Sequence, residues 1–302
     1  MKKIIVTNKY NEKKLSKFIL DNIPELTFNK FCMLLRKKDI KLNGKRLSKD
    51  CIIKANDEIV IYIPDSIKQK DLPINIIYED SNILIINKPE NLEVTGNNSL
   101  TTILHNKYSD YKFKPMPCHR IDRNTTGLVL FAKNQETLDI LLEKFKNHEI
   151  EKHYYAWVYS IPKEKSKNMI AYLFKDTKKS MVYISDINKK GYQKIITSYT
   201  VIEEYENNTC LLDVQIETGK THQIRAHLAH IGLPIIGDGK YGINSINKQF
   251  HKKTQSLCSY KLKFKFTNDS SILNYLNNQE FCIHTNPFFT IKNIVSKNAT
   301  SR

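Results

Sequence analysis

The sequence predicts an α+β protein with a small α/β domain at the N-terminus and a larger domain built mainly on antiparallel strands of a mixed sheet. Three observations support this. Residues 12–64 show helical and strand patterns in turn, residues from 74 onward form many short β-rich runs, and the polar segment 65–73 lacks periodicity. With 40% hydrophobic residues in 302, the chain has enough apolar material for real cores. The expected domains are 1–64 and 74–302, joined by a linker at 65–73.

The N-terminal domain is expected to contain two helices and several strands. Apolar residues recur at helical spacing in 14–20 and again in 29–38, with a break at 22–24. Residues 40–42 alternate as a strand and run into Asn43-Gly44, a pair that tolerates the positive φ angles of a tight hairpin turn. A further strand at 59–63 completes the domain.

The larger domain carries the strand patterns and one clear amphipathic helix, at about 135–147. Its most evident strands are 74–78, 83–87, 128–132, 154–159, 196–201 and 211–216. No internal repeat is present, so a repeat architecture is excluded.

The charge of the chain indicates a polyanionic partner. Lysine and arginine outnumber aspartate and glutamate by 48 to 31, which gives a formal net charge of +17. Residues 1–64 alone hold 15 basic and 7 acidic residues, so nearly half of the surplus lies in the first fifth of the chain. Such an excess favours nucleic acid over a membrane surface as partner.

Arginine is scarce, and its positions are therefore informative. Where lysine is the default cation, a remaining arginine indicates a place that needs a planar guanidinium able to form two hydrogen bonds at once. The six arginines are Arg36, Arg46, Arg120, Arg123, Arg225 and the terminal Arg302. Leaving the terminal residue aside, they mark three candidate sites.

The first candidate site comes just before the predicted strand 128–132. Residues 118–127 read CHRIDRNTTG and place Asp122 between Arg120 and Arg123 in a polar loop. Neighbouring cations favour the ionised carboxylate, which suits a nucleophile better than a general acid. The spacing alone also fits a structural Asp–Arg pair at the start of a strand.

The second candidate site is residues 217–232, which read ETGKTHQIRAHLAHIG. Five of the nine glycines fall between 219 and 242, where they permit loops whose free backbone N–H groups favour phosphate. On a helix here, His222 and Arg225 would share one face. The residues expected to face the core are Ile224, Leu228 and Ile231. The pattern alone also fits a solvated basic helix.

The third candidate site is the alternating strand KHYYAWV, residues 152–158. Successive side chains of a strand point to opposite faces, so Lys152 and Tyr154 lie on the same face. Taken by itself, a tyrosine on such a strand also fits simple packing.

Together and in this order, HRIDRNTTGLVLFAKN, KHYYAWV and ETGKTHQIRAHLAHIGLPIIGDGKYG resemble the motif regions of RluA-type RNA pseudouridine synthases. The stretch 78–89 resembles the start of that family's catalytic domain, and the likeness covers about 74–245. Residues 12–64 resemble the small αL RNA-binding module, which a ribosomal small-subunit protein shares with many of these synthases. The resemblance implies a pseudouridine synthase catalytic domain preceded by an αL RNA-binding domain.

The resemblance implies an isomerase that breaks the N-glycosidic bond of uridine in RNA, turns the uracil and rejoins it through carbon 5. Such an enzyme needs no metal and no other cofactor. Asp122 matches the family's essential aspartate, either as nucleophile or as base at the ribose, and the sequence leaves that choice open. Arg225 matches the arginine that pairs with it, and Tyr154 the tyrosine that stacks under the uracil. Arg120 matches the residue that fills the stack vacated by the flipped base.

Further substrate contacts are expected close to these residues, with phosphate as the expected contact of Arg123. The full set of expected substrate-binding residues is His119, Arg120, Arg123, Lys152, Lys220, His222 and Gln223. The chain departs from the family at Lys220, where relatives usually carry arginine, and at Asn91, where they often carry glycine. The lysine keeps the charge, and neither departure touches the three catalytic positions.

In the αL module a basic cluster is expected to contact RNA phosphates and to raise affinity in a salt-dependent way. Its residues are Arg36, Lys37, Lys38, Lys41, Lys45 and Arg46. A solvated basic face is the alternative interpretation. Asn56 stands where the module usually has glycine, and asparagine is the next best residue for a left-handed backbone.

The expected compartment is the cytoplasm. No run approaches the roughly 18 apolar residues of a membrane span, and the N-terminus lacks the apolar core of a secretory signal. The six cysteines have no zinc-ligand spacing and are expected to be reduced thiols. The expected partner is RNA, foremost bacterial large-subunit ribosomal RNA by resemblance, and the default oligomeric state is a monomer.

Three other functions are alternatives to a pseudouridine synthase. A catalytically idle RNA-binding or ribosome-assembly factor would keep the basic patch but would tolerate loss of Asp122. A metal-dependent nuclease would require clustered carboxylates, whereas Asp122 has only basic neighbours in its segment. A nucleoside hydrolase stays conceivable, and release of free uracil would distinguish it.

Overall fold

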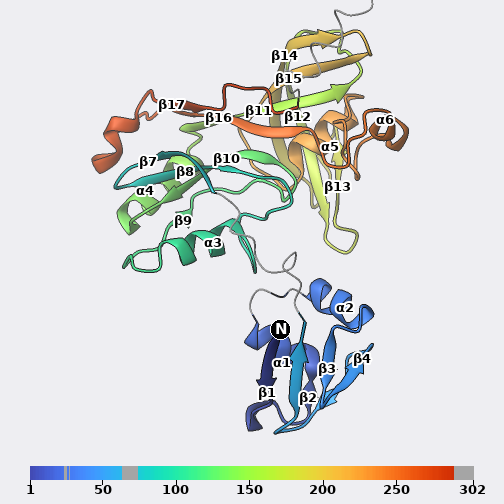
Figure 1. Ribbon diagram of the computed structural model, residues 1–302. Helices are drawn as coiled ribbons and strands as arrows, with labels where there is room; N and C mark the ends of the chain where they lie inside the picture. Colours follow the sequence, from blue (N-terminus) through green and yellow to red (C-terminus); the bar gives the residue numbers. More distant parts are fainter. Residues whose placement is uncertain (24–25, 27, 63–73, 289–302) are drawn as a thin grey trace, which may run out of the picture. The chain divides into compact units, whose positions relative to one another are not determined.

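The computed structural model describes residues 1–23, 26, 28–62 and 74–288 (Figure 1). The chain divides into two compact units, Met1–Pro73 with Gly96–Thr102, and Ile74–Thr95 with Ile103–Arg302. The linker expected at 65–73 lies outside the described residues, and the predicted domain limits stay predictions.

The first unit packs two helices on a small antiparallel sheet. The helices are α1 (Leu15–Asn22) and α2 (Phe28–Arg36). The sheet has the order β1 (Lys2–Ile5), β6 (Glu58–Ile61), β3 (Ile40–Leu42) and β4 (Lys45–Leu47), with β2 (Lys13–Lys14) and β5 (Ile52–Ile53) paired separately. Its core includes fully buried Phe18, Phe31 and Ile59. The β3–β4 turn has positive φ at Asn43 and Gly44, as predicted, and Asn56 is left-handed at φ 69°.

The second unit is organised around one large mixed sheet, which is antiparallel except where β10 runs parallel to β16. This confirms the predicted fold class. Along the sheet the strands are β13 (Met181–Ser185), β12 (Ser166–Asp176), β14 (Gln193–Tyr205), β15 (Thr209–Ile216), β11 (Ile150–Tyr159), β16 (Leu257–Phe264), β10 (Thr126–Ala132), β8 (Ile83–Lys88) and β7 (Asn75–Glu79). Two short strands add to it, β9 (Met116–Pro117) on β10 and β17 (Glu280–Cys282) on β16.

Helices pack against this sheet at two places. At one, Leu141 of α4 (Gln135–Lys146) joins the core formed by β8, β10 and β16, and the Asn134 side chain caps the helix by accepting a hydrogen bond from Thr137 N–H at 2.8 Å. At the other, Ala226 of α5 (Gln223–His230) packs on Leu173 and Val182. The remaining helices are α3 (Leu100–Lys107), α6 (Asn244–Gln249) and the 3₁₀ segments η1 (Asn8–Tyr10) and η2 (Ser271–Leu276).

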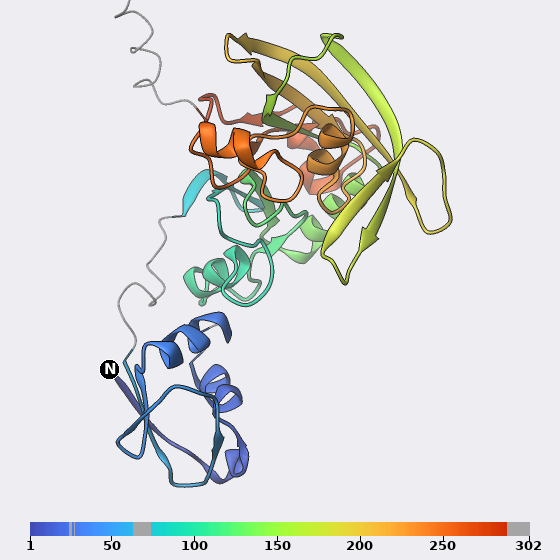
Figure 2. The same cartoon turned by 90° about the vertical axis from the view of Figure 1, so that its right-hand side faces the viewer.

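The last strands of the sheet bend away from this body. Figure 2 shows β12, β13 and β14 in yellow and gold curving at the edge of the second unit, with the β13–β14 loop projecting outward. The strands β12 and β13 were not predicted from the sequence, and each contains only a short apolar run, residues 169–174 and 181–184.

Gly127 permits the single parallel pairing of the sheet. It lies opposite Ser259 on β16, and a Cβ atom added to it would lie 2.2 Å from the Ser259 carbonyl oxygen. Its φ of +107° is also one that other residues rarely adopt. The glycine therefore lets β10 approach β16 closely, just after the loop that carries Asp122.

The prediction that Ile231 faces the core is wrong. Ile224 and Leu228 are buried as expected, but Ile231 is 37% exposed. The helix ends at His230, and the chain turns at Gly232 with φ +81°, so Ile231 leaves the helical face. Among the described residues, no helix is both long and apolar enough to cross a membrane.

Candidate active site

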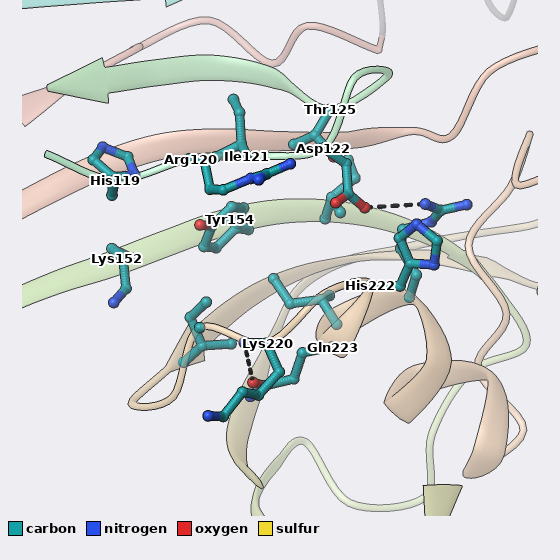
Figure 3. A pocket seen from close by; sticks show the side chains of 15 residues that line it. His119, Arg120, Ile121, Asp122, Thr125, Lys152, Tyr154, Lys220, His222 and Gln223 are labelled. Atoms are coloured by element: carbon teal, nitrogen blue, oxygen red, sulfur yellow. Dashed lines mark hydrogen bonds and ion pairs between the residues drawn. The ribbon is translucent and has the colours of Figure 1, made fainter. Parts of the chain in front are cut away.

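A cavity of about 240 Å³ brings together residues from all three candidate motifs (Figure 3). Its walls come from the loop before β10, from β11, from the end of β15 with the start of α5, and from the start of β16. Of the residues expected at the site, it is lined by His119, Arg120, Asp122, Lys152, Tyr154, Lys220, His222, Gln223 and Arg225. Arg123 does not line it.

An ion-pair chain fixes the carboxylate of Asp122. The Arg225 guanidinium donates to Asp122 through Nη1 at 3.0 Å, and to Asp238 through Nε at 2.6 Å and Nη2 at 2.9 Å. Asp238 is fully buried, whereas the Asp122 side chain is 27% exposed at the cavity. The two hydrogen bonds to Asp238 fix the plane of the guanidinium. The Nη1 donor then sets the direction of the Asp122 carboxylate.

Asp238 itself is held by backbone donors. Its Oδ1 atom accepts hydrogen bonds from the N–H groups of Lys240 and Tyr241 at 2.8 and 3.1 Å. Burial acts to raise the pKa of Asp238, but Arg225 and these N–H groups outweigh it, so the pKa is lowered. Asp238 is therefore ionised at neutral pH and holds the Arg225 guanidinium in place.

Tyr241 connects the Asp122–Arg225–Asp238 ion pairs to strand β13 and to His222. Its hydroxyl accepts from Val182 N–H on β13 at 2.8 Å and lies 3.0 Å from His222 Nδ1. Its ring centre is 5.3 Å from the Arg225 Cζ atom, a cation–π distance. His222 has a left-handed backbone, φ 53°, at the N-terminus of α5, and burial lowers its pKa. Strain of this kind persists where the surrounding contacts hold the residue.

Lys88 supports the Asp122 loop from behind. This fully buried lysine, at the end of β8, donates to three backbone carbonyl oxygens, those of Pro89 at 2.8 Å, Leu92 at 2.7 Å and Arg123 at 3.0 Å. Burial lowers its pKa to about 8, which the charge of Asp122 opposes. Lys88 thus fastens the segment after β8 to the residue that follows Asp122.

Tyr154 forms the floor of the cavity and is 5% exposed. Burial, together with the negative charge of Asp122, raises the pKa of Tyr154 well above its usual value. The hydroxyl therefore stays protonated at neutral pH, and the ring offers a flat apolar surface rather than a base.

Comparison with known proteins identifies the family. The family model described as RNA pseudouridylate synthase matches residues 82–230. The ribosomal large subunit pseudouridine synthase C of Buchnera aphidicola (subspecies Baizongia pistaciae) is 30% identical over 80% of this chain and 81% of its own length. The protein of the same name from Rickettsia bellii is 31% identical over 79% and 86%. This chain belongs to the RNA pseudouridine synthases of the RluA type.

A solved structure agrees in fold. Human RNA pseudouridylate synthase domain containing 4 matches with a TM-score of 0.58 and 21% identity, over 71% of this chain and 90% of that one. This pseudouridine synthase is accordingly an isomerase that acts on RNA.

The two arginines beside Asp122 differ in their surroundings. Arg120 lines the cavity of the synthase with an exposed side chain, and none of the described residues forms a hydrogen bond or ion pair with it. Arg123 is exposed outside the cavity, and its Nε donates to the Asn91 carbonyl oxygen at 3.4 Å. Asn91 is left-handed, φ 62°, which explains how asparagine serves where relatives often have glycine.

On the α5 side of the cavity, Gln223 is hydrogen-bonded within the protein, whereas the Lys220 side chain is exposed. Gln223 is 2% exposed, and its amide bonds to the Ile196 carbonyl and Thr197 hydroxyl and accepts from Lys220 N–H. It therefore holds the turn before α5 in place. The Lys220 side chain is exposed at the rim.

The basic cluster of the first unit lies at the end of α2 and on the β3–β4 hairpin. Lys41 and Arg46 are directly opposite each other, and Lys45 follows the turn. All members are exposed except Lys41, which is half-buried with its Nζ 5.4 Å from the Tyr62 ring centre. Lys38 adopts φ 58°, at the point where the chain leaves α2. Arg36 and Lys37 are the remaining members.

Three residues of the site were missed by sequence reasoning, namely Lys88, Asp238 and Tyr241. The last two lie within the GDGKYG segment that contributed to the resemblance, yet no spacing rule connected them to Arg225. Lys88 carried no signal, because lysine is the common cation of this chain.

Asp238→Asn is expected to destabilise the synthase by about 3–5 kcal/mol, because it removes one partner of a buried ion pair. Urea unfolding of the two proteins measures this. Asp186→Asn is the matched control, because that carboxylate also pairs with a basic side chain, His230, but is 80% exposed. Equal stability of Asp238→Asn and wild type would contradict the supporting role of Asp238.

Proposed function

We propose that this synthase isomerises specific uridines of bacterial large-subunit ribosomal RNA, and that each target uridine is flipped out of the RNA into the cavity. Relatives at 30 and 31% identity bear the name ribosomal large subunit pseudouridine synthase C. The observation that carries the proposal is the single cavity in which the Asp122–Arg225 ion pair lies beside the buried ring of Tyr154. The cytoplasm and the monomeric state stay predictions.

Asp122 acts on the ribose in this proposal. The reaction breaks the bond between C1′ and N1 of the uracil and forms a bond between C1′ and C5, and the hydrogen at C5 is lost. A carboxylate held by Arg225 is positioned either to attack C1′ or to take a proton from the ribose. Since Asp238 fixes Arg225 in turn, the carboxylate needs little reorganisation when the substrate arrives.

Tyr154 and Arg120 have different roles toward the target base in this proposal. The uracil would stack on the Tyr154 ring, whose raised pKa suits a stacking role rather than proton transfer. Flipping a base costs roughly a few kcal/mol of lost stacking. Arg120 is exposed and unpaired among the described residues, so its guanidinium plane is available to occupy the vacated stack.

The basic cluster of the first unit would add affinity without sequence selection. Its exposed cations are suited to phosphate contacts, which strengthen binding by release of counterions. Lys220 and Arg123, exposed at and beside the cavity, would contact phosphates close to the target, and His222 would contact the ribose side near Asp122. Gln223 would act by holding the 218–220 turn.

Asp122→Asn is expected to abolish turnover and to leave RNA affinity nearly unchanged, because the amide keeps the shape but cannot act as nucleophile or base. The assay measures tritium released from large-subunit ribosomal RNA labelled at C5 of uridine, and a filter-binding titration measures affinity. Retained release by Asp122→Asn would refute the role of Asp122. Free uracil among the products would instead indicate hydrolysis.

The triple variant Lys41→Gln, Lys45→Gln and Arg46→Gln is expected to bind RNA more weakly and with a smaller salt dependence. Each lost phosphate contact lowers the slope of log affinity against log salt by about 1. Turnover at saturating RNA should be unaffected, because the cavity lies wholly in the second unit. An unchanged salt slope, or lost turnover at saturation, would contradict this division of labour.

A further inference from the structure

Lys152 is a largely buried lysine on the cavity wall, and its ammonium group has no polar partner among the described residues. The residue is 9% exposed, and none of the described residues forms a hydrogen bond or an ion pair with its Nζ atom. The Phe145 ring lies beside it, with its centre 5.4 Å from Nζ. Burying an unpaired charge is costly, and burial lowers the pKa of Lys152. Because Lys152 lines the cavity, a bound molecule is the natural source of its missing acceptor.

His119 lies at the same end of the cavity as Lys152. Leu130 N–H donates to its Nε2 atom at 3.0 Å, so the proton of the neutral ring is on Nδ1. The ring is neutral because burial, and then the charge of Lys152, lower its pKa to about 3. Within the described part of the chain, Nδ1 has no hydrogen-bond partner. The His119 ring therefore adds neither a charge nor a free acceptor nitrogen beside Lys152.

Lys152 and His119 lie on the opposite side of Tyr154 from Asp122. In Figure 3 the Tyr154 ring lies between Asp122 on one side and Lys152 with His119 on the other. A uracil stacked on Tyr154 with its ribose carbon at Asp122 would therefore direct its far edge to Lys152.

The chemistry of uracil provides an acceptor at that edge throughout the reaction. In the six-membered ring, C4 with its oxygen O4 is opposite N1, and C2 with its oxygen O2 is opposite C5. When the base is attached through N1, O4 is the far atom, and when it is attached through C5, O2 takes that place. A donor fixed at the far end thus meets a carbonyl oxygen both before and after the base turns.

We propose that Lys152 is a catalytic residue that donates a hydrogen bond to the distal carbonyl oxygen of the uracil and stabilises the charge of the detached base. This proposal rests on the proposed function. When the C1′–N1 bond breaks, its electron pair passes to the uracil and is shared by N1, O2 and O4. After C5 bonds to C1′, the C5 proton leaves to solvent and N1 takes one up. His119 is a positioning residue, since its ring packs on Phe145 at 5.0 Å and helps to wall in the ammonium.

A phosphate is a poorer partner for this lysine. The phosphates of the strand are attached to the ribose and would remain on the Asp122 side of the cavity. Around Lys152 the neighbouring side chains are the aromatic rings of Phe145 and His119. Measurement of rate and affinity separates the two partners.

Lys152→Met is expected to slow tritium release under single-turnover conditions by about 10²-fold, the loss typical of one donor to a developing anion. The Kd for RNA and its salt dependence should change little, and Lys152→Arg should recover part of the rate by restoring the charge. The substrate is C5-tritiated ribosomal RNA from the fraction on which the wild type releases tritium. Lys263→Met, on β16 and partly exposed, is the matched control.

An unchanged rate in Lys152→Met would overturn the proposal. A loss of affinity and of salt dependence at an unchanged bound-state rate would also overturn it, and would assign the lysine to phosphate. Asp122→Asn is measured in the same series. If that variant releases tritium normally, the proposed role of Asp122 fails by itself, and the Lys152 result still stands.

A second, independent observation concerns the face of β12, β13 and β14 that points away from α5, called here the outer sheet face. Ala171 and Leu173 of β12 pack in the core with Ala226 of α5, so the alternate residues of the strand face outward. This outer sheet face and the adjoining loop carry four aromatic rings, Tyr172, Phe174, Tyr183 and Tyr192.

The rings are arranged as a shallow platform. Phe174 and Tyr183 are directly opposite across the β12–β13 pair and are 38% and 41% exposed. The rings of Phe174 and Tyr192 stack with centres 5.4 Å apart. An apolar residue, Ile170, extends the same face and is 56% exposed.

Lysines are frequent in this segment, and two of them lie beside the rings. Residues 170–196 contain six lysines and two aspartates, and one aspartate, Asp186, is paired with His230. Lys194 is directly opposite Tyr172, and Lys189 Nζ lies 5.9 Å from the Tyr192 ring centre. Stacking rings with surrounding cations are the features that bind single-stranded nucleic acid. We infer that the outer sheet face binds a single-stranded segment of the RNA substrate, with bases on the rings and phosphates on the lysines.

The double variant Phe174→Ala and Tyr183→Ala is expected to lower affinity for a fluorescent 12-nucleotide oligouridine by about 10-fold or more. Its melting temperature should match wild type, because both rings are half exposed. Tyr111→Ala, which removes another exposed tyrosine, is the control. Unchanged affinity for the oligonucleotide would overturn the inference. Unchanged affinity combined with lost co-sedimentation with ribosomal particles would overturn it in favour of a protein partner.

Discussion

The bond between Arg225 and Asp238 is the constraint on which the site depends. Two carboxylates share one guanidinium, and only the Asp122 carboxylate reaches the cavity. Lys88, buried behind the Asp122 loop, supplies a second positive charge, and Asp122 acts on its pKa. Two anions and two cations thus come close in a largely buried region. A charge left unpaired in the buried part of this group would be expensive.

The sheet brings these groups together from distant parts of the sequence. Arg225 and Asp122 are 103 residues apart, and they meet because α5 packs on the β12–β14 end while β10 lies next to β16. The close approach at Gly127 lets β10 lie there. Tyr241 then ties the guanidinium to β13 through Val182 N–H. The position of the Asp122 carboxylate is therefore a property of the whole second unit.

Sequence reasoning found the parts of the site that depend on residue type. The scarcity of arginine singled out Arg225 and Arg120, because a guanidinium resists the replacement by lysine seen elsewhere in this chain. The same bias concealed Lys88, which is one of 42 lysines and whose complete burial is evident only from the structure. Strand periodicity found β8, β10 and β15, each rich in apolar residues. It missed β13, whose partners lie on neighbouring strands and in α5. It also placed Ile231 on a helix that in fact ends at His230, just before the turn at Gly232.

The cavity has a polarity that matches the direction in which electrons must move. The Tyr154 ring lies between the carboxylate of Asp122 and the ammonium of Lys152. In the proposed mechanism the ribose lies at the Asp122 end and the base extends toward Lys152. Whether Asp122 attacks C1′ or removes a ribose proton, electron density passes from the ribose to the uracil. The ammonium at the far end would stabilise that transfer in both cases. Hence the proposed role of Lys152 does not depend on the choice that the sequence left open for Asp122.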